Sequence, residues 1–359
     1  MSPRGATTSS RIPRGKQLVL LAPSCRSFST TSSKSLRTSS ASPSSSLDPQ
    51  SVAHFSRLSQ QWWSPTGETA LLHAMNPVRI RFIKEKLAEV RAWDDSVREA
   101  ASKPEHEAPL CDGEWDWLQG LECLDVGCGA GLLTESLARA SGRVHGIDAS
   151  SSNIHMAISH ASQDPALHLH PSNGASKPWA DRHQASLSYQ HITAEDLLAE
   201  RSAALGQNEA QYDVVTAMEV IEHVNQPAQF LQTLTQLVKP GGHLFLSTIA
   251  RTPLSYLLTI LVAERALDLV SRGTHNHSQY IDPSELVGFF SDTKVGWIRP
   301  KEEQRDNIVP TQRLLHESRG VAYLPWKGIW QLAPRWTKGL PLNPSEQANY
   351  FFWIRRPVS

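Results

Sequence analysis

The chain has 359 residues, enough for one large domain or two domains of ordinary size, and its 40% hydrophobic content is normal for a globular protein. Lys and Arg together number 35, as do Asp and Glu, so the formal net charge is zero. Without an overall basic field, the composition argues against a nucleic acid as partner.

The first 47 residues differ from the rest of the chain. Residues 1–47 contain no Asp or Glu but seven Lys or Arg, among many Ser and Thr. A basic, acid-free, Ser-rich start is typical of a mitochondrial transit peptide, and we expect cleavage near residues 30–50. A disordered Ser-rich tail is the alternative. Residues 48–359 are then expected to form the folded domain.

From residue 121 onwards, short apolar runs alternate with helical patterns. Five runs, "LECLDVG", "GRVHGID", "SLSYQHIT", "YDVVTA" and "HLFLSTI", predict strands, and "KVGWIRP" and "NYFFWIRR" are two plausible closing strands. The alternation predicts an α/β fold with a doubly wound, Rossmann-like sheet of seven strands. Two helices are expected before the first strand, within residues 52–93.

Two segments interrupt this pattern. Residues 161–185 are rich in Pro, Gly, Asn and Ser without an apolar period, which predicts a surface insertion. Residues 251–285, after the fifth strand, are expected to form a lid. Its apolar core, residues 254–263, is far shorter than the ~20 residues that span a bilayer, so this segment could lie on a membrane but not cross it. A core helix packed on the sheet is the alternative.

A glycine-rich loop follows the first strand of the sheet. "LDVGCGAG" places Gly127, Gly129 and Gly131 between a strand and a helix, where backbone approaches a ligand closely. The third glycine is one position too early for a dinucleotide fingerprint. Asp148 ends the second strand, where a carboxylate can accept both hydroxyls of a ribose. The stretch resembles the S-adenosylmethionine-dependent methyltransferases; structural glycines of another α/β enzyme are the alternative.

Three further stretches narrow this resemblance. "FSRLSQQWW" and "LHAMNPVRIRFI" before the loop and "GTHNHSQYI" after it are similar to the ubiquinone-biosynthesis O-methyltransferases in their mitochondrial form. The resemblance implies S-adenosylmethionine as cofactor, with Arg79 at its carboxylate, Gly127 and Gly129 at its methionine part, Asp148 at the ribose and Met218 at its outer edge. Glu195 and Asp196 could bind the adenine amino group, although a helix N-terminus explains that pair almost as well.

The stretch "MEVIEHV" raises the question of a metal site. Glu219, Glu222 and His223 stand at i, i+3 and i+4, so on a helix they would share one face. The resemblance places the ligands of a divalent cation on these three residues, with Mg²⁺ as the first candidate and Zn²⁺ as the second. Against this, many metal-free methyltransferases also carry Glu-His here.

The implied reaction is methyl transfer to a phenolic hydroxyl of a polyprenylated dihydroxybenzene, that is, a catechol. A phenol has a pKa of about 10, and a cation held by Glu219 and His223 would favour the nucleophilic phenolate. No general base is obvious, and His275 and His277 of the lid are candidates. The alternatives are a metal-independent C- or N-methyltransferase and a catalytically silent scaffold.

The expected substrate also implies a location. Its polyprenyl tail resides in lipid, so we expect peripheral contact with the matrix side of the mitochondrial inner membrane. The apolar residues Leu257, Leu258, Leu261, Val262 and Leu269, flanked by arginines, suit such a contact. Other enzymes of quinone biosynthesis are expected as partners in a complex.

Overall fold

The computed structural model describes residues 46–64, 66–100, 116–170, 186–205, 211–266, 276–298, 311–340 and 344–358. All of them fall within one compact unit of the chain. The expected transit peptide lies outside the described residues, except for its last two. Ser46 and Leu47 are part of the fold, and Ser46 is fully buried.

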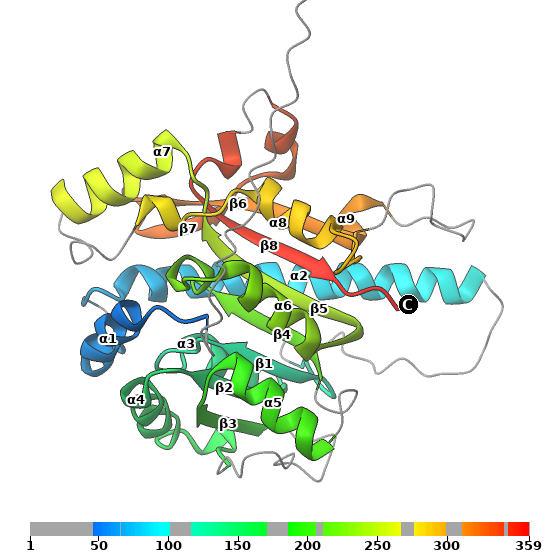
Figure 1. Cartoon of the computed structure of the whole chain (residues 1–359), viewed down its shortest axis with the longest axis horizontal. Coiled ribbons are helices and arrows are strands. Elements are labelled where there is room, and N and C mark those ends of the chain that lie inside the picture. Colours follow the sequence, from blue (N-terminus) through cyan, green and yellow to red (C-terminus); the bar gives the residue numbers. More distant parts are fainter. Residues whose placement is uncertain are drawn as a thin grey trace, which may run out of the picture. The chain divides into compact units, whose positions relative to one another are not determined.

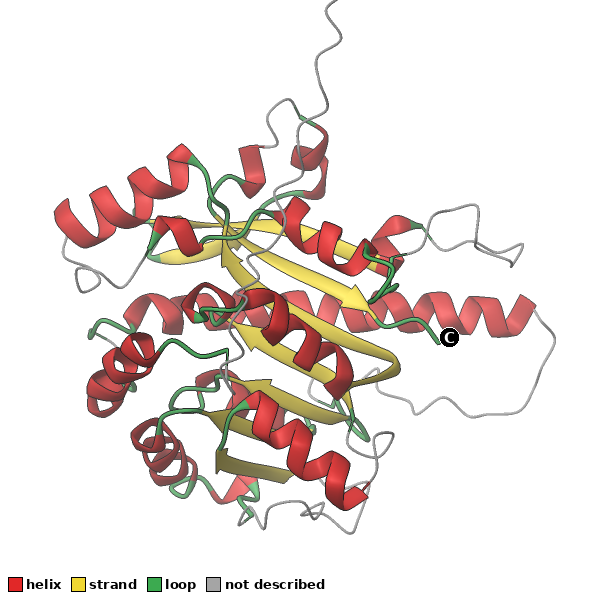
Figure 2. Cartoon of the chain, in the orientation of Figure 1, coloured by secondary structure: helices red, strands yellow, loops and turns green. Residues whose placement is uncertain are grey.

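One mixed sheet organises this unit. Its eight described strands have the order β3-β2-β1-β4-β5-β8-β6-β7 (Figure 2). Strands β3 to β5 of this order pair in parallel, whereas β8, β6 and β7 pair antiparallel. The strand order reverses at β1, and α/β sheets bind ligands at such a reversal. The strands are β1 (Glu122–Val126), β2 (Arg143–Asp148), β3 (Ser186–His191), β4 (Tyr212–Met218), β5 (Val238–Ile249), β6 (His316–Leu324), β7 (Ile329–Leu332) and β8 (Asn349–Arg355).

Helices cover both faces of the sheet (Figure 1). Successive strand residues point to opposite faces, so Cys123 and Leu124 of β1 belong to two different apolar clusters. The cluster around Cys123 also contains buried residues of α2, α3 and α4, and the cluster around Leu124 contains those of α5, α6 and α8. These helices are α2 (Ala70–Ala100), α3 (Leu132–Arg139), α4 (Ser151–Ala161), α5 (Ala194–Leu205), α6 (Pro227–Leu237) and α8 (Pro283–Ser291).

The remaining helices are short and lie at the edges of this framework. The chain before α2 forms α1 (Pro49–Leu58) and η1 (Ser59–Gln61), and β4 leads into η3 (Ile221–His223). The others are η2 (Pro165–Leu167), α7 (Pro253–Tyr256), η4 (Leu257–Ala266), η5 (His277–Gln279), α9 (Gln312–Leu315), η7 (Arg335–Gly339) and η8 (Pro344–Glu346).

The expected α/β fold is confirmed, but the sheet has eight described strands instead of seven, and one expected strand is misplaced. The described part of "KVGWIRP" forms turns, because Trp297 and Ile298 donate their backbone N–H groups to Phe290 O, at 3.1 and 3.0 Å. Trp297 stacks on the Phe290 ring at 5.4 Å between centroids, so its apolar surface is buried against α8. Strands β6 and β7 instead come from residues that follow this segment in the chain.

The two expected insertions are described only in part. Residues 161–170 pack on the fold: Leu167 is buried, and Leu169 forms a parallel bridge with Leu187 of β3. Residues 171–185 lie outside the described part of the chain.

The lid begins directly after β5. Thr252 caps α7 through a capping box with Ser255, and Arg251 bonds Glu285 of α8 at 2.9 Å. Residues 267–275 lie outside the described residues, and among those described no helix is long and apolar enough to cross a bilayer.

Candidate active site

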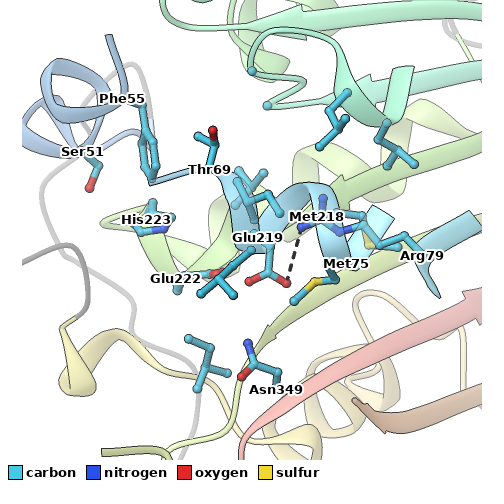
Figure 3. Close-up of a pocket in the computed structure, with 18 of the residues that line it drawn as sticks. Ser51, Phe55, Thr69, Met75, Arg79, Met218, Glu219, Glu222, His223 and Asn349 are labelled. Atoms are coloured by element: carbon cyan, nitrogen blue, oxygen red, sulfur yellow. Dashed lines mark ion pairs between the residues drawn. The ribbon is translucent and has the colours of Figure 1, made fainter. Parts of the chain in front are cut away.

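A cavity of about 570 Å³ lies at the carboxyl ends of the central parallel strands. Its lining comes from α1 and α2, the glycine loop after β1, the ends of β2, β4 and β5, and the C-terminal strands. The cavity therefore lies at the reversal of strand order, with helices that precede the sheet on one side and β6 to β8 on the other (Figure 3).

The glycine loop forms a cradle at the floor of this cavity. The N–H groups of Gly127 and Cys128 both donate to Ile147 O, at 2.8 and 2.9 Å, so the loop is tied to the end of β2. Gly129 has a φ of +55°, and a Cβ there would lie 2.2 Å from the Trp62 ring. A side chain at this position would collide with Trp62, so the close packing of Trp62 on the loop requires a glycine here.

Asp148 joins the loop to the end of β2. Its Oδ2 accepts the Gly129 N–H at 2.9 Å, and its Oδ1 accepts the Ser150 N–H at 2.8 Å and Asn153 Nδ2 at 3.3 Å. Burial raises the pKa of this carboxyl, while these hydrogen bonds oppose the rise. A carboxylate offers about four acceptor positions, and these three hydrogen bonds leave one of them for a ribose hydroxyl.

Arg79 lies among three carboxyl groups. It is buried, and its Nε and Nη2 have no hydrogen-bond partner among the described residues. Glu219 Oε1 lies 4.0 Å from Nη2, and burial lowers the pKa of Arg79 although Glu219, Asp125 and Glu222 raise it. Two unpaired donors on a buried guanidinium fit the carboxylate of a bound amino-acid moiety.

Asp125 is held differently, although burial raises its pKa to about 6. Its two oxygens accept the hydroxyls of Thr134 and Thr216 at 2.6 and 2.7 Å. The carboxyl group is therefore committed to the framework beneath the loop.

Glu219 does not begin a helix, so the helical arrangement on which Glu219, Glu222 and His223 would share one face does not form. Glu219 has a φ of +59°, in the left-handed region, and η3 comprises only Ile221–His223. The Glu219 N–H donates to Ser247 O at 3.2 Å and to Ser247 Oγ at 2.8 Å, so β5 fixes this turn.

The turn nevertheless brings two carboxyl groups together. Figure 3 shows the side chains of Glu219 and Glu222 pointing toward one another in the cavity. Glu219 Oε1 and Glu222 Oε2 are buried without a hydrogen-bond partner among the described residues. Burial, and then the neighbouring Glu219, raise the pKa of Glu222 to about 8. These two groups are therefore a site that a positive charge would stabilise.

His223 also lines the cavity, but it packs on an aromatic ring. Its imidazole meets the Phe55 ring of α1 edge-on at 4.9 Å between centroids. Among the described residues, no three His, Cys, Asp or Glu side chains are already arranged as a metal site.

Other predicted positions fall in different places. Met218, at the end of β4, lines the cavity. His277 Nε2 lies 3.0 Å from Thr252 O, so this histidine ties the two ends of the lid together, and it does not line the cavity. His275 lies outside the described residues.

Two of the lining residues that sequence reasoning missed lie close to the carboxyl pair and His223. Asn349 of β8 points toward Glu219 in Figure 3, and Phe55 covers His223. No local pattern marks Asn349, because 130 residues separate it from Glu219. Phe55 does lie within the stretch "FSRLSQQWW" that carried the family resemblance.

Known proteins are similar in sequence to this chain over most of its length. Residues 79–293, more than half of the chain, match the family model of a methyltransferase domain. A ubiquinone biosynthesis O-methyltransferase of Caulobacter vibrioides is 36% identical over 291 residues, which cover 81% of this chain and 91% of that protein. The chain belongs to the ubiquinone biosynthesis O-methyltransferases. As a member, it is an S-adenosylmethionine-dependent enzyme.

Two mitochondrial relatives strengthen this assignment. The mitochondrial enzyme of Schizosaccharomyces pombe is 34% identical to this methyltransferase, covering 88% of each chain. That of Dictyostelium discoideum is 40% identical, covering 67% of this chain and 65% of its own. The methyltransferase family expected from the glycine loop and its flanking stretches is thus confirmed.

The role of Asp148 can be tested by cofactor binding. Replacing Asp148 with Ala removes an acceptor for a ribose hydroxyl and releases Gly129, so the affinity for S-adenosylmethionine should fall roughly 100-fold. Isothermal titration calorimetry measures it, with Asp164→Ala on the surface as the matched control. Equal affinities of the two variants would contradict this role.

Proposed function

We propose that this methyltransferase transfers a methyl group from S-adenosylmethionine to a phenolic hydroxyl of a polyprenylated catechol, with a divalent cation at Glu219 and Glu222. The observation that supports this best is the pair of buried carboxyl groups beside the cofactor cradle. Their unpaired oxygens, Glu219 Oε1 and Glu222 Oε2, lie where β4 ends, on the same edge of the sheet as the glycine loop.

The donor set fits a cation in its chemistry. Carboxylate oxygens are the ligands that Mg²⁺ prefers, and an imidazole suits Zn²⁺. Glu219 and Glu222 would hold the ion, with His223 as the third ligand. When bound, a divalent cation lowers the pKa of a coordinated phenol, which is about 10 in water, and a shift of about three units corresponds to roughly 4 kcal/mol.

The chain's own residues would orient the donor. Arg79 pairs with its amino-acid carboxylate, the Gly127 and Gly129 backbone faces its methionine part, Asp148 binds the ribose, and Met218 borders its outer edge. S-adenosylmethionine supplies a methyl group on a sulfonium centre. Holding this group against one fixed hydroxyl replaces a collision of two free molecules, and such positioning accounts for a large part of a rate enhancement.

The cavity also offers room for an apolar tail. Beyond the carboxyl pair, its lining includes Leu254 and Leu258 of the lid and Pro325 and Trp330 near the β6–β7 turn. Leu254, Tyr256, Leu257 and Leu258 expose 38–46% of their surface, more than a packed core helix would leave. This favours the lid as a membrane contact over the alternative of a core helix.

The membrane we propose is the mitochondrial inner membrane, contacted peripherally from the matrix side. The transit-peptide composition of residues 1–47 and the mitochondrial relatives support this location. A lipid-resident intermediate passes between several enzymes, so we also propose that the chain works in a complex with other enzymes of quinone biosynthesis.

The carboxyl pair can be tested by activity. Glu219→Gln or Glu222→Gln keeps the side-chain shape but removes a charged ligand, so catechol methylation in Mg²⁺ should fall roughly 100-fold. Methylation of a short-chain catechol is the measurement, and Glu200→Gln on the surface of α5 is the control. If both variants keep full turnover and a chelator leaves the native enzyme unaffected, the cation has no part in the reaction.

The membrane contact can be tested separately by flotation. Leu257 is 46% exposed and does not line the cavity, so Leu257→Glu should weaken binding to anionic phospholipid vesicles several-fold without changing methylation of a short-chain catechol. The matched control is Ile158→Glu on α4, where the native residue is 39% exposed. Equal flotation of the two variants and the native chain would remove the lid from the contact.

A further inference from the structure

Residues Ser46 and Leu47, here called the N-terminal strap, cross from the start of α5 to the segment after η3. The Ser46 side chain is fully buried, and its Oγ donates to Glu195 Oε1 at 2.6 Å. The Ser46 backbone N–H reaches the same oxygen at 3.4 Å. One oxygen of Glu195 is thus fixed by a residue that precedes it by 149 positions.

The other side of the strap is held by backbone groups. Ser46 O accepts the Asn225 N–H at 2.8 Å and the Gln226 N–H at 3.4 Å. Leu47 forms an antiparallel bridge with Val224, the residue after His223. The backbone of both Ser46 and Leu47 is therefore bound to residues 224–226, and this fixes the position of the Ser46 hydroxyl.

The second oxygen of Glu195 is in a different situation. Oε2 is buried without a hydrogen-bond partner among the described residues, and Glu195 lines the cavity together with Asp148, Ala149 and Ile192. A buried acceptor without a donor is costly unless a ligand supplies one. The group that lies beyond a ribose in the donor is adenine, whose 6-amino group is a hydrogen-bond donor.

Asp196, the neighbouring carboxylate, is already used. Its Oδ2 accepts the Thr193 hydroxyl at 2.8 Å, and its own N–H donates to Thr193 Oγ1 at 3.1 Å. This reciprocal pair caps the start of α5. The structure thus gives Glu195 and Asp196 different surroundings, which the sequence alone could not show.

Glu195 Oε2 is the acceptor expected for the adenine 6-amino group, and we propose that Ser46 is the positioning residue that holds this carboxylate in place for it. Ser46 binds Oε1 and so restricts rotation of the carboxylate, while Oε2 of this cavity-lining residue stays without a partner among the described residues. The inference rests on the proposed function, which places S-adenosylmethionine in this cavity. It also requires that any removal of the leader leave Ser46 in place, because the strap completes the adenine end of the site.

The test compares two ligands that differ only at the adenine. S-adenosylhomocysteine carries the 6-amino group, and its 6-deamino purine analogue lacks it. Ser46→Ala should weaken binding of S-adenosylhomocysteine about tenfold in isothermal titration calorimetry and leave binding of the analogue unchanged. Unchanged binding of the analogue also shows that the variant is folded.

Two further variants separate positioning from general loosening. Glu195→Gln should lose the same discrimination between the ligands, and adding Ser46→Ala to it should cause no further loss. Asn225→Ala removes only the contact of its Nδ2 with Leu47 O, at 3.3 Å, and should retain discrimination.

The outcomes are distinct. Equal weakening of both ligands by Ser46→Ala would make Ser46 merely structural and overturn the proposal. A native chain that binds both ligands equally well would remove Glu195 from adenine recognition and leave the proposed function standing. A native chain that binds neither ligand would refute the proposed function itself.

Discussion

The rest of this site depends on two carboxyl groups that are held side by side and away from water. Glu219 and Glu222 point toward one another, and burial together with this neighbour raises the pKa of Glu222 to about 8. Arg79 is the nearest compensating charge, yet its Nη2 is 4.0 Å from Glu219 Oε1, too long for a strong hydrogen bond. Such an arrangement is stable only if a further positive charge or a proton is supplied.

The backbone maintains this arrangement. Glu219 occupies the left-handed region, and Ser247 of β5 accepts its N–H through both the carbonyl and the hydroxyl oxygen. Residues other than glycine seldom adopt this conformation. Where they do, the surrounding structure imposes it, often at a functional site. Pairing of β4 with β5 therefore sets the position of the carboxyl pair, and the same sheet edge carries the glycine loop and Asp148.

Features whose residues lie close together in the sequence could be predicted from it. The glycine loop and Asp148 lie within 22 residues, and strand runs such as "LDV" and "YDVV" show themselves by local composition. The i, i+3, i+4 spacing could not show whether the chain is helical at Glu219, because Ser247 of β5, 28 residues away, imposes the turn found there. The strand predicted for "KVGWIRP" does not form, because the Trp297 ring packs on Phe290 of α8. Tertiary packing therefore overrides the local preference for a strand.

The central claim is most directly tested by a crystal structure of the protein with S-adenosylhomocysteine, a catechol and Mn²⁺ in place of Mg²⁺. The account predicts an anomalous scattering peak between the Glu219 and Glu222 carboxylates, within bonding distance of a catechol oxygen. A structure in which both ligands are bound in the cavity, with no anomalous peak beside these two groups, would contradict it.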